Sequence, residues 1–277
     1  MTPVFHHYIS KFYLKHFAAE KIKTPNIYRY DKKYLVGRMA STGKSAGEDH
    51  FNTVPWLKNP AFFEDAYNKL IETPSVEPFR STIRNKEFGS EKDLNSILLF
   101  FALTTTRNPT ERSLIEGPMR KIDEIITASA LGNVQAAPII QTMRSKSYPV
   151  SKHIEMEIEI IDPIYEALKG KFWSLHQGVK EAGDFITGDY PLIILRADSA
   201  PPWGLNSPNA VIYAPISSDL AMLGTSAPLQ DTPPLSKSDI AALNGRIFHT
   251  ANRYVFSRSK SFPIDLLDGS PILNGLE

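Results

Sequence analysis

Apolar residues recur at helical spacing in the first half of the chain. In residues 9–17 they fall at the i, i+3, i+4 and i+7 positions of one face, which predicts a short helix. From residue 60 to about residue 144 the pattern stays helical, and residues 97–103 are apolar nearly all round. A helix with apolar residues on every side is buried, so we expect 97–103 at the centre of the core.

Capping residues mark where three helices should begin. Ser90–Asp93 combines a serine cap with an acidic third position, and Asn108–Glu111 adds a proline at the first helical position. The second signal predicts a long amphipathic helix to about Leu131. Ser236–Asp239 predicts a last long helix through about Asn252.

Residues 153–161 alternate strictly between polar and apolar side chains. A period of two favours a half-buried strand, which is the structure that we predict here. A helix is the alternative, because glutamate favours helices and Asp162-Pro163 is typical of a helix start.

Short apolar runs broken by Gly, Pro, Asp and Asn predict strands. Two lie near the N-terminus, at 26–30 and 34–36, and are followed by a loop at 40–47. The others are expected at 172–176, 185–187, 192–195, 211–215, 220–224 and 254–257. Together the elements predict a single α+β domain over 1–277. Its helical portion is expected at about 60–150, and its antiparallel sheet portion, closed by a long helix, at about 151–260.

Composition narrows the class of protein. The chain has 277 residues, of which 42% are hydrophobic and 22% charged, as in ordinary globular proteins. It has no cysteine, which excludes disulfides, thiolate nucleophiles and cysteine-ligated metal sites. The N-terminus lacks a signal-peptide pattern, and the longest apolar run is too short to cross a bilayer. We therefore expect a cytoplasmic protein with no membrane association.

Positive charge is concentrated at the N-terminal end. Residues 1–44 contain nine Lys and Arg against two acidic residues, so their surplus of seven leaves −6 for the rest of a chain with net charge +1. Six aromatic residues lie among these charges: Tyr8, Phe12, Tyr13, Tyr28, Tyr30 and Tyr34. Such a segment can hold phosphates and stack bases, which makes nucleic acid or a nucleotide the expected partner. The alternative is a solvated face whose rings are buried.

Several motifs resemble one known family. His6-His7-Tyr8, followed by Phe12-Tyr13-Leu14 and Phe17, resembles the opening of the bacterial family called domain of unknown function 4238, although Ser10-Lys11 stand where that family has a proline-glutamine pair. Further similarities lie at Asn26–Asp31, Asp49–Phe51, Glu64, Glu72, Arg107–Pro109, Phe185–Pro191, Asn244 and Tyr254–Phe256. In Phe185–Pro191, glycine and tyrosine replace the family's serine and asparagine. The resemblance covers most of the chain and implies no known reaction.

The two adjacent histidines are the first candidates for chemistry. Imidazole titrates near neutrality, so His6 or His7 can act as a general acid or base or bind a metal. Neighbouring residues of an extended segment point in opposite directions, so only one should face a given site, and we favour His7. The alternative is a histidine that hydrogen-bonds a buried backbone group and fixes the N-terminus.

Four further polar residues have both a functional and a structural interpretation. Asp189 at a strand end can orient a histidine, bind a metal or activate water, or it can cap backbone amides before Pro191. Arg107 can clamp a phosphate, or it can pair with its helix C-terminus or with a buried acid. Glu64 and Glu72 are two helical turns apart and can bind a cation together, or they can be surface glutamates.

Two functions fit these residues. The first is a phosphodiester hydrolase acting on nucleic acid or nucleotides, with His7, His6, Asp189, Arg107 and Glu64 in one site that a divalent metal could assist. The second is a non-catalytic binding or interaction module, for example in conflict between bacteria and phages. The sequence contains no His-Glu-x-x-His zinc motif and no Gly-x-Gly-x-x-Gly turn.

Overall fold

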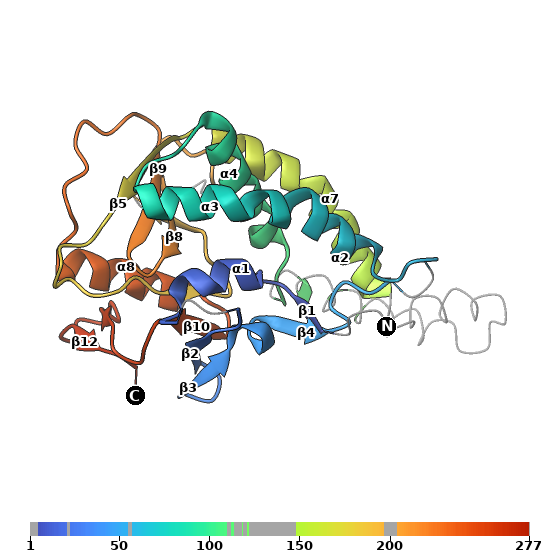
Figure 1. Cartoon of the computed structure of the whole chain (residues 1–277), viewed down its shortest axis with the longest axis horizontal. Helices are drawn as coiled ribbons and strands as arrows, with labels where there is room; N and C mark the ends of the chain where they lie inside the picture. Colours follow the sequence, from blue (N-terminus) through green and yellow to red (C-terminus); the bar gives the residue numbers. More distant parts are fainter. Residues whose placement is uncertain are drawn as a thin grey trace.

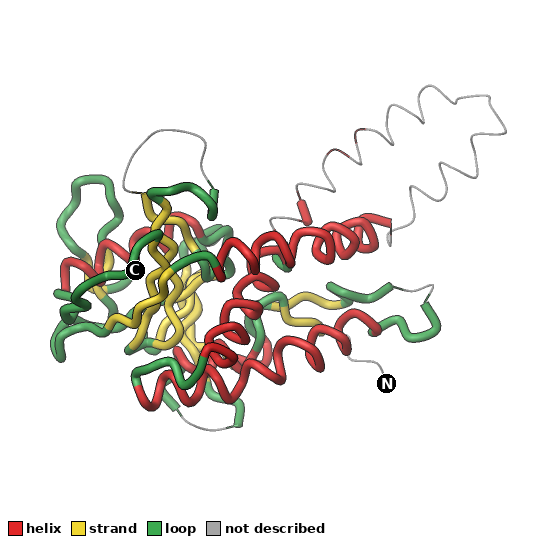
Figure 2. Tube along the Cα trace, turned by 90° about the horizontal axis from the view of Figure 1, so that it is seen from above, coloured by secondary structure: helices red, strands yellow, loops and turns green. Residues whose placement is uncertain are grey.

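In the computed structural model, the helices of residues 62–169 form one part of the molecule, and antiparallel sheets with the remaining helices packed among them form the other (Figures 1 and 2). The structure describes residues 5–20, 23–54, 57–109, 112, 113, 118, 121, 148–196 and 204–276. The fold class is α+β, as predicted. Within the described ranges, no helix is long and apolar enough to cross a bilayer. The helix predicted from Pro109 to about Leu131 lies almost entirely outside the described residues.

The helical layer is built around one apolar helix. It comprises α2 (Phe62–Tyr67), the π-helix η3 (Asn68–Glu72), α3 (Thr73–Asn85), α4 (Glu91–Thr106) and α7 (Tyr148–Lys169). Helix α4 begins where predicted, because the Ser90 hydroxyl accepts a 3.1 Å hydrogen bond from the Asp93 backbone N–H. It packs against α3 and α7, and six of the seven residues 97–103 are at most 1% exposed. This confirms the predicted centre of the core.

The strand predicted for 153–161 is wrong, and the helical alternative is right. These residues belong to α7, so the helical portion extends to Lys169, and the first strand after it begins at Phe172 rather than near residue 151. The buried positions recur at helical spacing: Ile154, Glu157, Ile161 and Leu168. The other apolar residues of the alternating pattern are largely exposed: Met156, Ile158 and Ile160. Packing against α4 thus overrides the local period of two.

Two four-stranded antiparallel sheets form the other part of the fold. The first has the order β3 (Val36–Ser41), β2 (Asn26–Asp31), β10 (Tyr254–Ser257), β6 (Thr187–Gly188). The second has the order β5 (Phe172–His176), β9 (Leu220–Thr225), β8 (Ala210–Ser217), β7 (Ile193–Arg196). The N-terminal hairpin β2–β3 therefore pairs with a C-terminal strand, with Tyr30 opposite Val255. The sheets are not confined to the second half of the chain.

Helix α8 (Lys237–Thr250) begins at the predicted capping box of Ser236 and Asp239 and packs against β6, β7 and β11 (Pro263–Ile264). Asn244 makes three hydrogen bonds from this helix. Its side chain accepts from the Ile186 N–H at 3.0 Å and donates to the carbonyls of Asp184 at 2.9 Å and Pro263 at 2.7 Å. Strand β11 pairs in turn with β12 (Leu273–Asn274). Asn244 therefore joins a segment that precedes α8 in the chain, Asp184–Ile186, to one that follows it at Pro263.

The N-terminal segment lies between the helical layer and the first sheet (Figure 1). It contains β1 (Phe5–His7), α1 (Lys11–Leu14) and η1 (Lys15–Phe17). Strand β1 pairs with β4 (Gly47–Asp49), which follows the short helix η2 (Thr42–Lys44) in the chain. Tyr13 is fully buried. Its hydroxyl donates to the Pro215 carbonyl at 2.6 Å and lies 2.9 Å from the Thr187 hydroxyl. The aromatic opening of the chain is thus part of the core.

Candidate functional site

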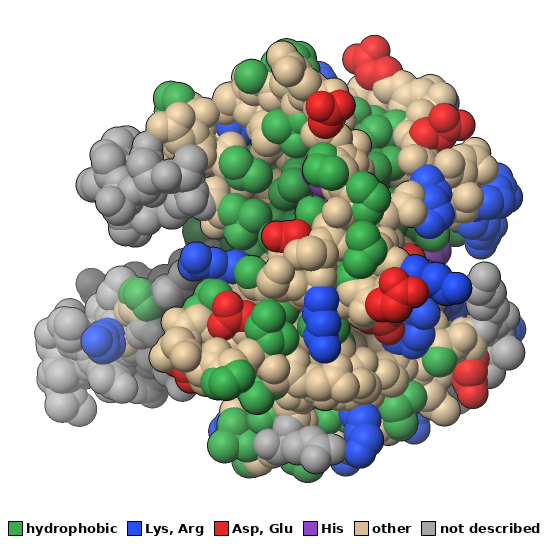
Figure 3. Space-filling view, turned by 90° about the vertical axis from the view of Figure 1, so that its left-hand side faces the viewer, with side chains coloured by type: hydrophobic (Ala, Val, Ile, Leu, Met, Phe, Trp, Pro, Cys, Tyr) green, Lys and Arg blue, Asp and Glu red, His purple; other side chains and the backbone are tan. Residues whose placement is uncertain are grey.

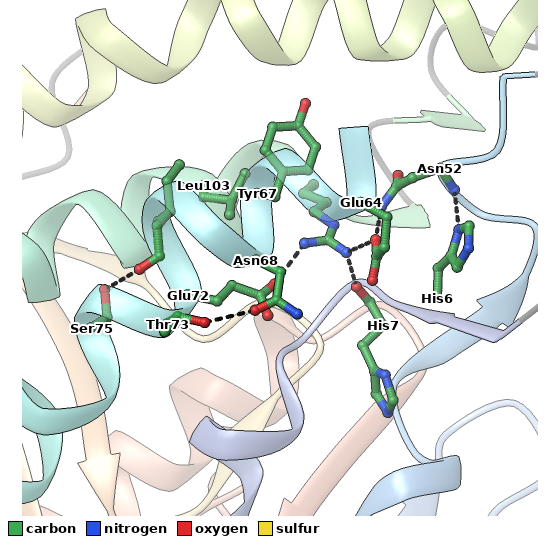
Figure 4. A network of polar contacts seen from close by, with 12 residues as sticks. His6, His7, Asn52, Glu64, Tyr67, Asn68, Glu72, Thr73, Ser75 and Leu103 are labelled. Atoms are coloured by element: carbon green, nitrogen blue, oxygen red, sulfur yellow. Dashed lines mark hydrogen bonds and ion pairs between the residues drawn. The ribbon is translucent and has the colours of Figure 1, made fainter. Parts of the chain in front are cut away.

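Arg107 lies at the centre of a buried ionic cluster, which Figure 4 shows from close by. At the C-terminal end of α4, its guanidinium donates to Glu72 Oε1 at 2.7 Å and to Glu64 Oε2 at 2.6 Å. A third bond, at 2.5 Å, reaches the backbone carbonyl of His7. Burial opposes the positive charge, but Glu72 and Glu64 outweigh it and raise the pKa of Arg107. We call Arg107, Glu64 and Glu72 the Arg107 cluster.

The π-helix η3 aligns the two glutamates of this cluster. Eight residues of an ideal α-helix turn through about 800°, which would leave Glu64 and Glu72 about 80° apart around the axis. The wider turn of η3 takes up one extra residue, so the offset is closer to that of seven residues, about 20°. Pro74, two residues after η3, has no N–H to donate to the preceding turn. Both carboxylates can therefore reach one guanidinium.

A third acid, the buried Glu157, is connected to the cluster through Tyr67. The Tyr67 ring centre lies 5.3 Å from the Arg107 guanidinium carbon, and its hydroxyl donates to Glu157 Oε2 at 2.7 Å. The other oxygen of Glu157 lies 2.6 Å from His153 Nε2, and both side chains are 1% exposed. Burial and Glu157 raise the pKa of Tyr67, so it remains a donor. The wrong strand prediction for 153–161 meant that this pair was not expected. The i, i+4 spacing of His153 and Glu157 is the sequence signal that a helix would have brought them together.

The two histidines play different parts. His6 is fully buried, and its Nδ1 accepts the Asn52 backbone N–H at 2.9 Å; the Asn52 side chain in turn donates to Glu64 at 2.8 Å. His7 offers its carbonyl to Arg107 while its ring points away from the guanidinium (Figure 4). The His7 Nε2 is buried and has no hydrogen-bond partner within the described part of the chain. Burial lowers the pKa of His7, which favours the neutral imidazole.

Asp189 lies apart from this cluster. It is 3% exposed, and its carboxylate accepts three backbone N–H groups at 2.8 Å, from Asn252, Arg253 and Tyr254. Burial raises the pKa of Asp189, and the three donors oppose that rise. No contact among the described residues joins its carboxylate to His7 or Arg107. The structure thus brings together His6, His7, Glu64 and Arg107, and uses Asp189 to hold the loop between α8 and β10.

The glutamate pair does bind a cation, but that cation is the guanidinium of Arg107. Within the described ranges, no three His, Asp or Glu side chains lie close enough together to hold a metal ion. One arginine against Glu64 and Glu72 also leaves the Arg107 cluster with a net charge of −1. Because both glutamates pair with Arg107, a phosphate finds no unpaired positive charge in this cluster.

Most of the tyrosines of the basic N-terminal segment, and one of its lysines, are used internally. Tyr8, Tyr13, Tyr28 and Tyr30 are buried, whereas Tyr34 is 63% exposed. Lys32 donates to the carbonyls of Phe248 and Ala251 at the C-terminal end of α8. For Tyr8, Tyr13, Tyr28 and Tyr30, the structure therefore agrees with the alternative in which the rings are buried.

A group of cations nevertheless remains together on the first sheet. Arg29 on β2 lies opposite Arg38 on β3, and Tyr254 on β10 lies opposite Asp31. The guanidinium carbons of Arg29 and Arg253 lie 4.9 Å and 4.7 Å from the Tyr254 ring centre. Both Arg253, at 5.5 Å, and Lys33, at 5.4 Å, lie over the Tyr34 ring. We call this surface the cationic face; it comprises Arg29, Lys33, Tyr34, Arg38, Arg253 and Tyr254.

Comparison with known protein families shows which family the chain belongs to. The family model described as "Protein of unknown function (DUF4238)" matches residues 6–261. The chain belongs to this family. No curated protein and no solved structure matches it. The DUF4238 match confirms the resemblance that begins at His6-His7-Tyr8, and it spans both the Arg107 cluster and the cationic face. The family description names no activity.

Proposed function

We propose that this DUF4238 protein is a non-catalytic binding module that holds single-stranded nucleic acid on its cationic face. The pairing of Arg29 with Arg38 is the main support. Like charges directly opposite each other on neighbouring strands destabilise a sheet, and a bound phosphate would remove that cost. Asp31 offsets one charge through its 2.9 Å bond to Arg253, which leaves a surplus of three on this face.

The aromatic residues of the cationic face favour an unpaired strand over a duplex. Tyr34 is the most exposed of the six N-terminal aromatics, and its ring lies close to both Lys33 and Arg253. Exposed rings among cations stack on unpaired bases while the cations follow the phosphates. On the side of the molecule seen in Figure 3, basic and acidic side chains are interspersed.

Charge reversal of Arg29 and Arg38 together should weaken binding of a fluorescent single-stranded oligonucleotide by about a hundredfold at low salt, because two phosphate contacts become repulsive. The dependence of log K on log salt should also become shallower by roughly 1 to 2. Tyr34→Ala should cost about fivefold to a hundredfold through lost stacking. Fluorescence anisotropy on a salt series measures both effects.

The matched control reverses two exposed charges on the helical layer, Arg84→Glu with Lys92→Glu, which gives the same change in net charge. It should change affinity far less than the cationic-face variant. Equal losses in the two double variants would reduce the effect to net charge, and the proposal would fail. Duplex of the same length should bind more weakly than the single strand.

Phosphodiester hydrolysis is a second candidate, supported by the unpartnered Nε2 of His7. A neutral imidazole with a free nitrogen can accept a proton from water. If this candidate is right, the protein cleaves oligonucleotides in a screen with and without divalent metals, and His7→Gln, but not His50→Gln at an exposed position, lowers the rate at least a hundredfold. Equal rates in both variants would rule out His7 as the base. A role in conflict between bacteria and phages stays a prediction.

A further inference from the structure

A polar depression of about 470 Å³ opens beside the C-terminal end of α3. Its walls come from Lys86, the segments Gln177–Lys180 and Gly183–Phe185, Asp219 and Arg258. At about 30 Å³ for each water molecule, it has room for roughly 15 waters, or for a small ligand with a similar number of non-hydrogen atoms. None of its lining residues belongs to the Arg107 cluster or the cationic face.

One part of the depression carries an excess of negative charge. Arg258 Nη2 lies 2.7 Å from Asp219 Oδ1, and Arg258 Nε lies 3.5 Å from Asp184 Oδ2. A single guanidinium thus faces two carboxylates. The Asp184 side chain is only 22% exposed, and burial raises its pKa. A ligand ammonium group beside Asp184 would compensate this partly buried charge.

Two lysines supply positive charge to the same depression. Lys86 Nζ donates one hydrogen bond to Gln177 Oε1 at 2.8 Å, which leaves two of its N–H groups for a ligand. Lys180 is exposed at the rim. Lys86 occupies the residue position after α3 with φ +62°, where glycine is the usual residue. A lysine there accepts backbone strain and places its ammonium group over the depression.

We propose that the depression binds a short zwitterionic peptide of two or three residues. Its N-terminal ammonium group lies by Asp184 and Asp219, and its C-terminal carboxylate lies by Lys86 and Lys180. A free phosphate would meet two carboxylates, and a simple cation would meet two lysines, so a ligand with both charges fits best. This site is independent of nucleic-acid binding.

Isothermal titration calorimetry of the full chain with trialanine, N-acetyl-trialanine and trialanine amide tests the proposal. Each blocked peptide lacks one of the two charges and should bind about tenfold more weakly, or worse, than trialanine, because a charged hydrogen bond is lost. Absence of binding by trialanine, or equal affinity for all three peptides, would overturn the proposal.

Two variants assign the ends of the peptide. Asp184→Asn should lower affinity for trialanine about tenfold and leave binding of N-acetyl-trialanine unchanged. Lys180→Met, at an exposed position where substitutions change stability little, should lower affinity for trialanine about tenfold and leave binding of trialanine amide unchanged. The control Asp162→Asn on the outer surface of α7 should bind like the unmodified chain. Unchanged affinity in both depression variants would place the peptide elsewhere and contradict the assignment.

Discussion

Replacing Arg107 with methionine is expected to lower the free energy of unfolding by about 3–5 kcal/mol, the usual cost of removing one partner from a buried ion pair. The change leaves Glu64 and Glu72 without their cation and the His7 carbonyl without its donor. It also removes a fully buried side chain that joins α4, η3 and β1. Equilibrium unfolding in urea, followed by tryptophan fluorescence, measures the loss.

The triple variant Arg107→Met, Glu64→Gln, Glu72→Gln separates charge from packing. Neutral amides are much cheaper to bury than unpaired carboxylates, so this variant should regain part of the lost stability. Arg84→Met, at an exposed position of α3, should stay within about 0.5 kcal/mol of the unmodified protein. A loss below about 1 kcal/mol in Arg107→Met would show that the Arg107 cluster does not hold these elements together.

Local signals in the sequence were sufficient for most elements. Ser90 and Ser236 mark helix starts because a serine cap acts over three residues, and residues 97–103 are so apolar that only a central position suits them. The strand prediction for 153–161 is wrong because the alternation of polar and apolar residues does not determine which residues of this segment are buried. The buried face is determined by packing against α4, which lies some 50 residues earlier in the chain.

The candidate site was predicted in part. His7, Glu64 and Arg107 meet because β1, α2 and the end of α4 converge, and the spacing of Glu64 and Glu72 pointed to a shared cation. Both glutamates reach Arg107 because η3 is a π-helix, and the residue spacing in the sequence does not predict a π-helix. Asp189 illustrates the opposite case. A carboxylate at a strand end looks the same in sequence whether it faces a cleft or backbone amides from a distant loop.

Asp189→Asn is expected to lower the melting temperature by about 2–12 °C. The amide presents a donor where the carboxylate accepted, so at least one of the N–H groups of Asn252, Arg253 and Tyr254 loses its acceptor. Each buried group left unpaired costs about 1–3 kcal/mol, and in a chain of this size 1 kcal/mol corresponds to roughly 2–4 °C. Differential scanning calorimetry gives the shift directly.

The Asp189→Asn substitution also tests the proposed function. Two of the three N–H donors belong to Arg253 and Tyr254, which form part of the cationic face. Well below the melting temperature, the variant should therefore bind a single-stranded oligonucleotide several-fold more weakly, although Asp189 itself is buried away from solvent. Asp162→Asn, the same chemical change at an exposed site, should alter neither property. An unstable variant with undiminished affinity would mean that Arg253 and Tyr254 do not contact the nucleic acid.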